Sequence, residues 1–282
     1  MDKRTGLRGR GHAYQADQAR RALGISGDVP HLAAVPFPIV HAALGVAACA
    51  VAVALRPGMV GLEGSVIGVA ALCVASGVAL VVYDRLVYPP QARPPVEAVA
   101  LPVAALCAFS LVLAANVQLG PRLLAAAVTV VVIGGLPHLG GLRATGHEGW
   151  GTRLLRDAAG VAVLVPVLLA GASDGLPLLV RAAVVLVGVG LVTLDGLQTE
   201  ALTRRRSVLL AAVVGLAVTA VLVAMDRLAL GTGERAAVTL IAWYGVRGVA
   251  SGTGGWRQHL RNVAEYGVVV AIALLALSRF VH

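Results

Sequence analysis

The sequence contains few charged and few aromatic residues. Of its 282 residues, 13% are charged and 4% are aromatic, whereas 58% are hydrophobic, and the mean hydropathy is +0.86. A soluble domain ordinarily has about 25% charged and about 45 to 50% apolar residues. This composition therefore excludes an ordinary soluble globular domain.

The motifs of several common enzyme classes are also missing. The sequence has no Gly-rich phosphate loop with Lys, no His-Glu-x-x-His, no pair of Asp-rich motifs and no Gly-x-Ser-x-Gly. Its three cysteines, Cys49, Cys73 and Cys107, have no paired spacing, so we interpret them as small apolar packing residues. We expect no metal ion, no cofactor and no catalytic residues.

The sequence does contain long apolar runs. Nine runs of 15 to 24 residues occur, and about 20 residues cross a hydrocarbon layer of about 30 Å as helix. We predict an all-α polytopic transmembrane helical bundle of about nine spans without a soluble domain. A basic cytoplasmic arm forms residues 1–34, and a single transmembrane domain forms residues 35–282. The predicted spans are Val35–Leu55, Met59–Val82, Ala98–Val117, Leu123–Leu142, Ala158–Ala172, Leu178–Leu197, Ser207–Met225, Ala236–Ala250 and Ala264–Phe280.

The distribution of basic residues predicts the orientation. With nine spans, 17 of the 23 basic residues fall on the side of the N-terminal arm and six on the other side. Lys and Arg accumulate in cytoplasmic segments, so we predict a cytoplasmic N-terminus and an outside C-terminus. Because all but one of these cations are Arg, as in a GC-rich bacterial coding sequence, we assign the chain to a bacterial inner membrane. Topology explains the net charge of +9, so we expect no nucleic-acid partner.

Two predicted spans are short. Ala158–Ala172 and Ala236–Ala250 have 15 residues each, which is less than the hydrocarbon thickness at 1.5 Å per residue. The first can begin at Leu154 if Arg156 extends to the headgroups, and the second can continue to Gly255. The alternative is that one of them does not cross, which leaves eight spans and both termini in the cytoplasm.

Polar residues inside the predicted spans indicate a candidate pocket. With the predicted orientation, most of these side chains lie in the cytoplasmic half of the membrane, where a charge tends to face a partner or a wet cavity. The candidate pocket residues are His41, His138, Asp195, Trp243, Tyr244, Arg247 and Glu265. We expect Arg247 and Glu265 to form an ion pair between the last two spans. The alternative is that Asp195, Arg247 and Glu265 mark span ends at the headgroups.

Three further features of the sequence bear on ligation, helix packing and the N-terminal arm. His41 and His138 lie at similar depth and can ligate a haem, although hydrogen bonding to a neighbouring helix is the more common role of a lone histidine. The glycine pairs Gly64/Gly68 and Gly248/Gly252 have the spacing of close helix packing. Residues Tyr14–Leu23 form either a short helix on the membrane surface or a loosely ordered arm.

Three function classes therefore remain. The favoured class is a membrane protein that transports or binds a small or lipid-like molecule in a cytoplasm-facing pocket. The second is a structural or accessory subunit of a membrane complex, and the third, disfavoured by the missing motifs, is an intramembrane enzyme that modifies lipid. The expected partners are membrane lipids, with another membrane protein or a second copy of the chain as candidates.

Overall fold

The computed structural model describes residues 39–87, 90, 93–115, 118–144, 150–198, 202–228, 230–250 and 256–280. Within these residues the regular elements are helical, as predicted, with nine α-helices and the short 3-10 helix η3. The elements are α2 (Ile39–Ala54), α3 (Pro57–Val87), η3 (Val96–Val99), α4 (Ala100–Ala114), α5 (Leu119–Ala144), α6 (Trp150–Ala172), α7 (Leu178–Leu197), α8 (Arg204–Met225), α9 (Thr232–Ala250) and α10 (Trp256–Phe280). The predicted arm and its candidate helix over Tyr14–Leu23 lie outside the described residues.

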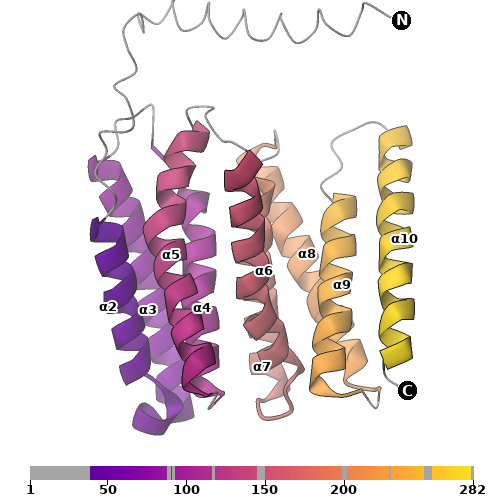
Figure 1. Cartoon of the computed structure of the whole chain (residues 1–282), viewed down its shortest axis with the longest axis horizontal. Coiled ribbons are helices and arrows are strands. Elements are labelled where there is room, and N and C mark those ends of the chain that lie inside the picture. The colour runs from indigo at the N-terminus through magenta and orange to yellow at the C-terminus, as the bar shows by residue number, and fades with distance from the viewer. Residues whose placement is uncertain are drawn as a thin grey trace, which may run out of the picture. The chain divides into compact units, whose positions relative to one another are not determined.

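The helices lie side by side with roughly aligned axes (Figure 1). Successive helices run in opposite directions (Figure 1). Two side-chain contacts illustrate this arrangement, because each joins the start of one helix to the end of the next. Arg156 near the start of α6 contacts Asp195 near the end of α7, and Arg181 near the start of α7 contacts Asp226 just after α8. We call these two ends of the bundle the Asp195 end and the Asp226 end.

Each predicted span overlaps one of these α-helices, but their lengths differ. Five helices in the described residues are long and apolar enough to cross a membrane: Pro57–Leu86, Val96–Ala114, Leu154–Ala172, Leu178–Leu197 and Arg204–Met225. Two further apolar helices, Ile39–Ala54 and Leu119–Gly135, are shorter. Within the described part of the chain, five helices are therefore both long enough and apolar enough to cross a membrane, and two more are apolar but shorter.

The first of the two short predicted spans is extended as expected, but for a different reason. The apolar part of α6 begins at Leu154. Arg156, however, does not extend to the headgroups, because its side chain is buried and bonded to Asp195. A carboxylate inside the bundle compensates the guanidinium charge, so the helix can start earlier without exposing that charge.

The second short span is extended at its start, and its predicted continuation to Gly255 lies outside the described residues. Helix α9 begins at Thr232 and ends at Ala250, and residues 251–255 lie outside the described part of the chain. The Glu234 carboxylate accepts a hydrogen bond of 2.9 Å from the Gly231 backbone N–H. An acidic side chain in the first turn that bonds a preceding N–H is a favourable helix start, which explains the earlier boundary.

The main hydrophobic core lies chiefly among α4, α6, α7 and α8. Its largest buried members include Leu101, Val163, Leu164, Val167, Leu168, Val185, Val189, Val214, Val218 and Leu222. Helices α6 and α7 approach closely because a glycine of each faces a valine of the other. A Cβ atom added at Gly171 would lie 2.3 Å from Val185 Cγ2, and one added at Gly188 would lie 2.6 Å from Val167 Cγ1. Small residues at these positions allow the two backbones to pack tightly.

Of the glycines singled out in the sequence, Gly248 packs most closely against another helix. A Cβ atom there would lie 2.2 Å from the Tyr266 ring of α10. Gly68 faces Leu55 at the end of α2, whereas Gly64 faces only Val60 of its own helix. Gly252 lies outside the described residues. One glycine from these two pairs, Gly248, thus packs closely against α10. The close contacts between α6 and α7 involve Gly171 and Gly188, which were not among the glycine pairs singled out in the sequence.

Gly61 interrupts the first turn of α3. Its φ of 75° and ψ of 170° are not helical, and its φ falls in the region that only glycine adopts readily. The continuous helix therefore runs over residues 62–87, a length of about 39 Å at 1.5 Å per residue. Even without its first turn, α3 exceeds a hydrocarbon thickness of about 30 Å.

Candidate functional site

A buried ion pair joins α6 and α7 at the Asp195 end. Arg156 donates from Nε and Nη2 to the two carboxylate oxygens of Asp195, at 2.8 and 2.6 Å. The two side chains are 6% and 4% exposed. Such bidentate geometry is the strongest form of this interaction, and it neutralises two charges within an apolar bundle.

Helix α9 adds a second layer of polar contacts to this pair. The Trp243 ring N–H donates a 3.0 Å hydrogen bond to the Thr193 hydroxyl of α7. Arg247, one turn further along α9, lies over the Trp243 ring at 5.3 Å from its centroid. Its Nη2 is 3.6 Å from the Asp157 carboxylate of α6, longer than a good hydrogen bond.

Glycine makes this arrangement possible on the α7 side. A Cβ atom added at Gly196 would lie 2.4 Å from Arg247 Nη2, so the guanidinium group occupies the space beside that backbone. We call the group that joins these three helices the α6–α7–α9 cluster; its members are Arg156, Asp157, Thr193, Asp195, Trp243 and Arg247. Its two arginines differ, because Arg156 is enclosed whereas Arg247 and Asp157 are 26% and 63% exposed.

An apolar groove lies next to this cluster. It has a volume of about 240 Å³ and is lined by residues of α6, α9 and α10: Val161, Leu240, Ile241, Trp243, Tyr244, Val269 and Val270. Trp243 belongs to both features, because its ring faces the groove while its N–H bonds Thr193. The site thus combines an apolar groove with charged groups one helical turn away.

The structure brings together three of the residues predicted for the pocket. Asp195, Trp243 and Arg247 all belong to the α6–α7–α9 cluster, and Tyr244 lines the adjacent groove. Tyr244 also packs edge to face against Tyr266 of α10, with ring centroids 5.3 Å apart. Three of the seven predicted residues thus lie in one cluster, and their role in a ligand pocket stays a prediction.

The predicted ion pair between Arg247 and Glu265 needs correction. Arg247 contacts Asp157 of α6, and the Glu265 carboxylate accepts a 2.6 Å hydrogen bond from Arg261 of its own helix. Both members of the α10 pair are exposed. The carboxylate that contacts Arg247 therefore comes from α6, which is distant from α9 in the sequence.

The two histidines of the predicted pocket have separate outcomes. His41 is fully buried on α2, where its Nε2 lies 3.0 Å from the Asp84 carboxylate of α3 and its ring meets Tyr83 edge to face at 4.5 Å. This is the hydrogen-bonding role that the alternative interpretation gave to a lone histidine. The side chain of His138, on α5, lies outside the described part of the structure.

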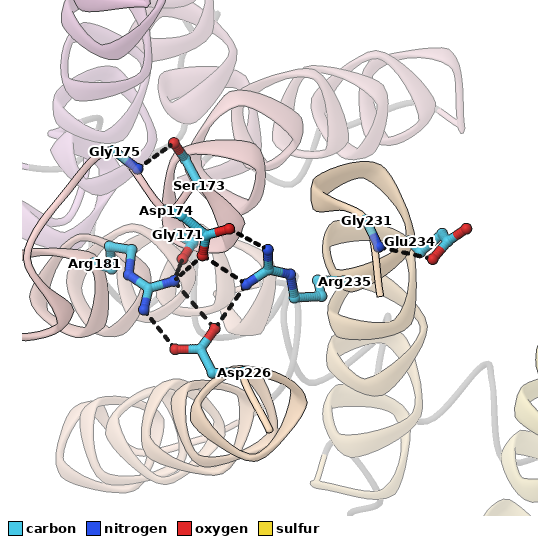
Figure 2. Close-up of polar contacts among 9 residues, drawn as sticks. All are labelled: Gly171, Ser173, Asp174, Gly175, Arg181, Asp226, Gly231, Glu234 and Arg235. Carbon is cyan, nitrogen blue, oxygen red and sulfur yellow. Dashed lines mark hydrogen bonds and ion pairs between the residues drawn. The ribbon is translucent and has the colours of Figure 1, made fainter. Parts of the chain in front are cut away.

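A second charged cluster closes the Asp226 end of the bundle (Figure 2). Asp174 and Asp226 lie between Arg181 and Arg235, so that each carboxylate contacts both guanidinium groups. Arg235 donates to Asp174 at 3.0 and 2.7 Å, and Arg181 donates to Asp226 at 3.1 and 2.5 Å. Arg181 also donates to the Gly171 carbonyl at 3.4 Å.

This second cluster links the connections at one end of four helices. Asp174 lies in the loop after α6, Arg181 starts α7, Asp226 follows α8 and Arg235 starts α9. Hydrogen bonds from Arg235 hold the pKa of Asp174 below its ordinary value, and the charges of Arg235 and Arg181 add to this effect. The two positive and two negative charges balance. The cluster therefore holds the helix ends together and has no excess charge for a ligand.

The sequence patterns did not predict this second cluster or the role of Arg156. No sequence pattern predicted the partners of Arg181 or Asp226. One signal was present: Arg and Asp residues occur at the helix ends that flank two short connections, after α6 and after α8. Their mutual contacts depend on which helices are neighbours, and local sequence patterns do not specify that.

Within the described residues no three His, Cys, Asp or Glu side chains come together as a metal site. Comparison of the chain with known protein families, with curated proteins and with solved structures finds no match in any of the three. The functional argument therefore rests on the α6–α7–α9 cluster and its groove.

Proposed function

We propose that this chain is a multi-pass membrane protein of a bacterial inner membrane, with nine crossing helices, a cytoplasmic N-terminus and an outside C-terminus. The apolar exterior supports this proposal. Large hydrophobic side chains are exposed along α3, α7 and α8, among them Ile67, Val74, Val78, Leu179, Val187, Leu209, Val213 and Leu216. A soluble monomer rarely exposes apolar patches of this extent, whereas lipid covers them at no cost.

The orientation is tested by fusing reporters to the full chain. A periplasm-dependent reporter such as alkaline phosphatase, joined after His282, should be active, and a cytoplasm-dependent reporter at the same position should be inactive. The opposite pattern would place the C-terminus in the cytoplasm and overturn the proposed orientation.

We further propose that the protein binds a small or lipid-like molecule in the groove between α6, α9 and α10. The observation that carries this proposal is the position of Trp243, which faces the apolar groove and connects it to the charged α6–α7–α9 cluster. A ligand in the groove would place an apolar part against the valines and a polar part near Arg247. The same geometry occurs in ligand sites that are mostly apolar with a few polar groups that orient the ligand.

Filling the groove tests this proposal. In the Val161→Phe variant, the larger ring should occupy the groove and reduce quenching of Trp243 fluorescence by lipids with brominated acyl chains. The matched control is Val213→Phe, because Val213 is similarly exposed on α8 but does not line the groove. Replacing Trp150 and Trp256 by Phe leaves Trp243 as the only reporter. Equal quenching in both Phe variants would contradict groove binding.

One observation favours a second candidate function, that of a subunit in a membrane complex. Only 17% of the most apolar stretch of α3 is buried, compared with 56% for the corresponding stretch of Val96–Ala114. Another protein can cover this uncovered helix as well as lipid can. Purification of the full chain from its native membrane in a mild detergent should yield a stoichiometric protein partner if this role is correct, and lipid alone if it is not.

A further inference from the structure

We infer that the groove ligand is an acidic membrane lipid, whose acyl chain lies between α9 and α10 and whose anionic headgroup contacts Arg247. This inference rests on the proposed groove-binding function and specifies its ligand class. It follows from the depth of the groove, from the charge at its rim and from its size.

The depth of the lining residues gives the ligand a direction. Arg247 lies three residues before the end of α9, about 4.5 Å from that end at 1.5 Å per residue. Tyr244, Ile241 and Leu240 line the groove at successively deeper positions on the same helix. A lipid in the groove would therefore have its headgroup at the Asp195 end, where the bilayer surface lies, and its chain directed towards the bilayer centre.

The charge at the rim selects the headgroup. Arg156 is enclosed and has a bidentate carboxylate partner, so it does not lie at the exposed rim. Arg247 is partly exposed, and its contact with the exposed Asp157 is weak, because the two groups are 3.6 Å apart. Because a weak, solvated ion pair is easily exchanged for another anion, an acidic headgroup can replace Asp157 at the guanidinium group.

The position of Arg247 over Trp243 joins the two parts of the ligand. The guanidinium carbon lies 5.3 Å from the ring centroid, which fixes the cation above a ring that also faces the groove. The groove volume of about 240 Å³ is below the range of about 300 to 1,000 Å³ for sites that enclose a whole small molecule. It therefore suits part of one chain, with the headgroup outside at Arg247.

The experiment compares headgroups with the acyl chain kept constant. The full chain, with Trp243 as its only tryptophan, is reconstituted in nanodiscs of phosphatidylcholine that contain increasing fractions of brominated phosphatidylglycerol or brominated phosphatidylcholine. We expect half-maximal quenching of Trp243 at an about fivefold lower fraction of the acidic lipid, since one cation near an anionic surface contributes about 1 kcal/mol. Inorganic phosphate should not compete, because it lacks the chain.

Variants separate a direct role of Arg247 from a structural one. Arg247→Gln should remove the headgroup preference and leave quenching by brominated phosphatidylcholine unchanged, whereas Arg247→Lys should retain the preference. Asp157→Asn should increase it, because the headgroup no longer competes with the carboxylate; a merely structural ion pair would weaken it instead. The matched control, Arg261→Gln, removes an exposed arginine of α10 whose partner is Glu265.

The outcomes distinguish the two proposals. If both brominated lipids quench Trp243 equally and Val161→Phe reduces both signals, the groove binds lipid and the headgroup inference is wrong. If Val161→Phe changes neither signal, the groove-binding function itself is wrong. Loss of the preference in Arg261→Gln as well as in Arg247→Gln would assign it to general surface charge and also overturn the inference.

Discussion

The buried pair Arg156–Asp195 provides the sharpest stability prediction. Both side chains are almost fully enclosed and form two short hydrogen bonds, so removal of one partner leaves the other charge inside the bundle. Breaking a buried pair in this way costs about 3 to 5 kcal/mol. We expect Asp195→Ala and Arg156→Ala each to lose stability in that range, because the remaining charge keeps its desolvation cost without its main partner.

The double variant shows whether the loss comes from the pair. Once one partner is gone, removing the second also removes the uncompensated charge, so Arg156→Ala/Asp195→Ala should lose no more than the less stable single variant. The coupling free energy should then approach about 3 kcal/mol, the upper end of values for contacting residues. The assay is reversible unfolding of the full chain in mixed detergent and dodecyl sulfate, followed by circular dichroism.

An exposed pair on α10 is the control for this cycle. Arg261 and Glu265 lie one turn apart and are 70% and 56% exposed, so their single variants should lose far less stability than those of the buried pair. Strictly additive losses for Arg156 and Asp195, or losses no larger than those at the α10 pair, would refute the claim that a buried charge dominates this end of the bundle.

Two further predictions concern α7 and the Asp226 end. Gly188→Ala should destabilise the protein by about 1 to 3 kcal/mol in the same unfolding assay, because the new methyl group would lie 2.6 Å from Val167 Cγ1; Gly190→Ala, whose nearest neighbour is at 3.8 Å, should be neutral. Asp174→Asn should lower the melting temperature at neutral pH. Because contact with Arg235 lowers the folded-state pKa of Asp174, its contribution is present above the unfolded pKa and is lost as the pH falls through the folded pKa. A difference between wild type and variant that does not shrink as the pH falls would contradict this assignment.

Much of the fold followed from local sequence patterns. Each apolar run predicted a helix, because backbone groups in an apolar environment must bond within their own segment. Boundaries were less accurate where charge and helix coincide. The apolar part of α6 begins at Leu154, as the extension past Arg156 allowed, although the helix itself begins at Trp150. The start of α9 was missed because the first turn there is polar, with Glu234 bonding back to Gly231.

The candidate site was predictable in part, for a different physical reason. Asp195 and Arg247 stood out because charges are costly in apolar segments. Their partners, Arg156 and Asp157, come from α6, and no periodicity along the chain states that α6 contacts both α7 and α9. The expected partner of Arg247, Glu265, was chosen because α9 and α10 are neighbours in sequence, yet its carboxylate bonds Arg261 on the exposed side of α10.

The ionic contacts at both ends of α7 have a mechanical consequence. Arg181 anchors one end of this helix to α8 through Asp226, and Asp195 anchors the other end to α6 through Arg156. A slide of α7 along its axis by a single turn, about 5.4 Å, would break both anchors at once. Helix α7 is thus held in a fixed axial register relative to α6 and α8.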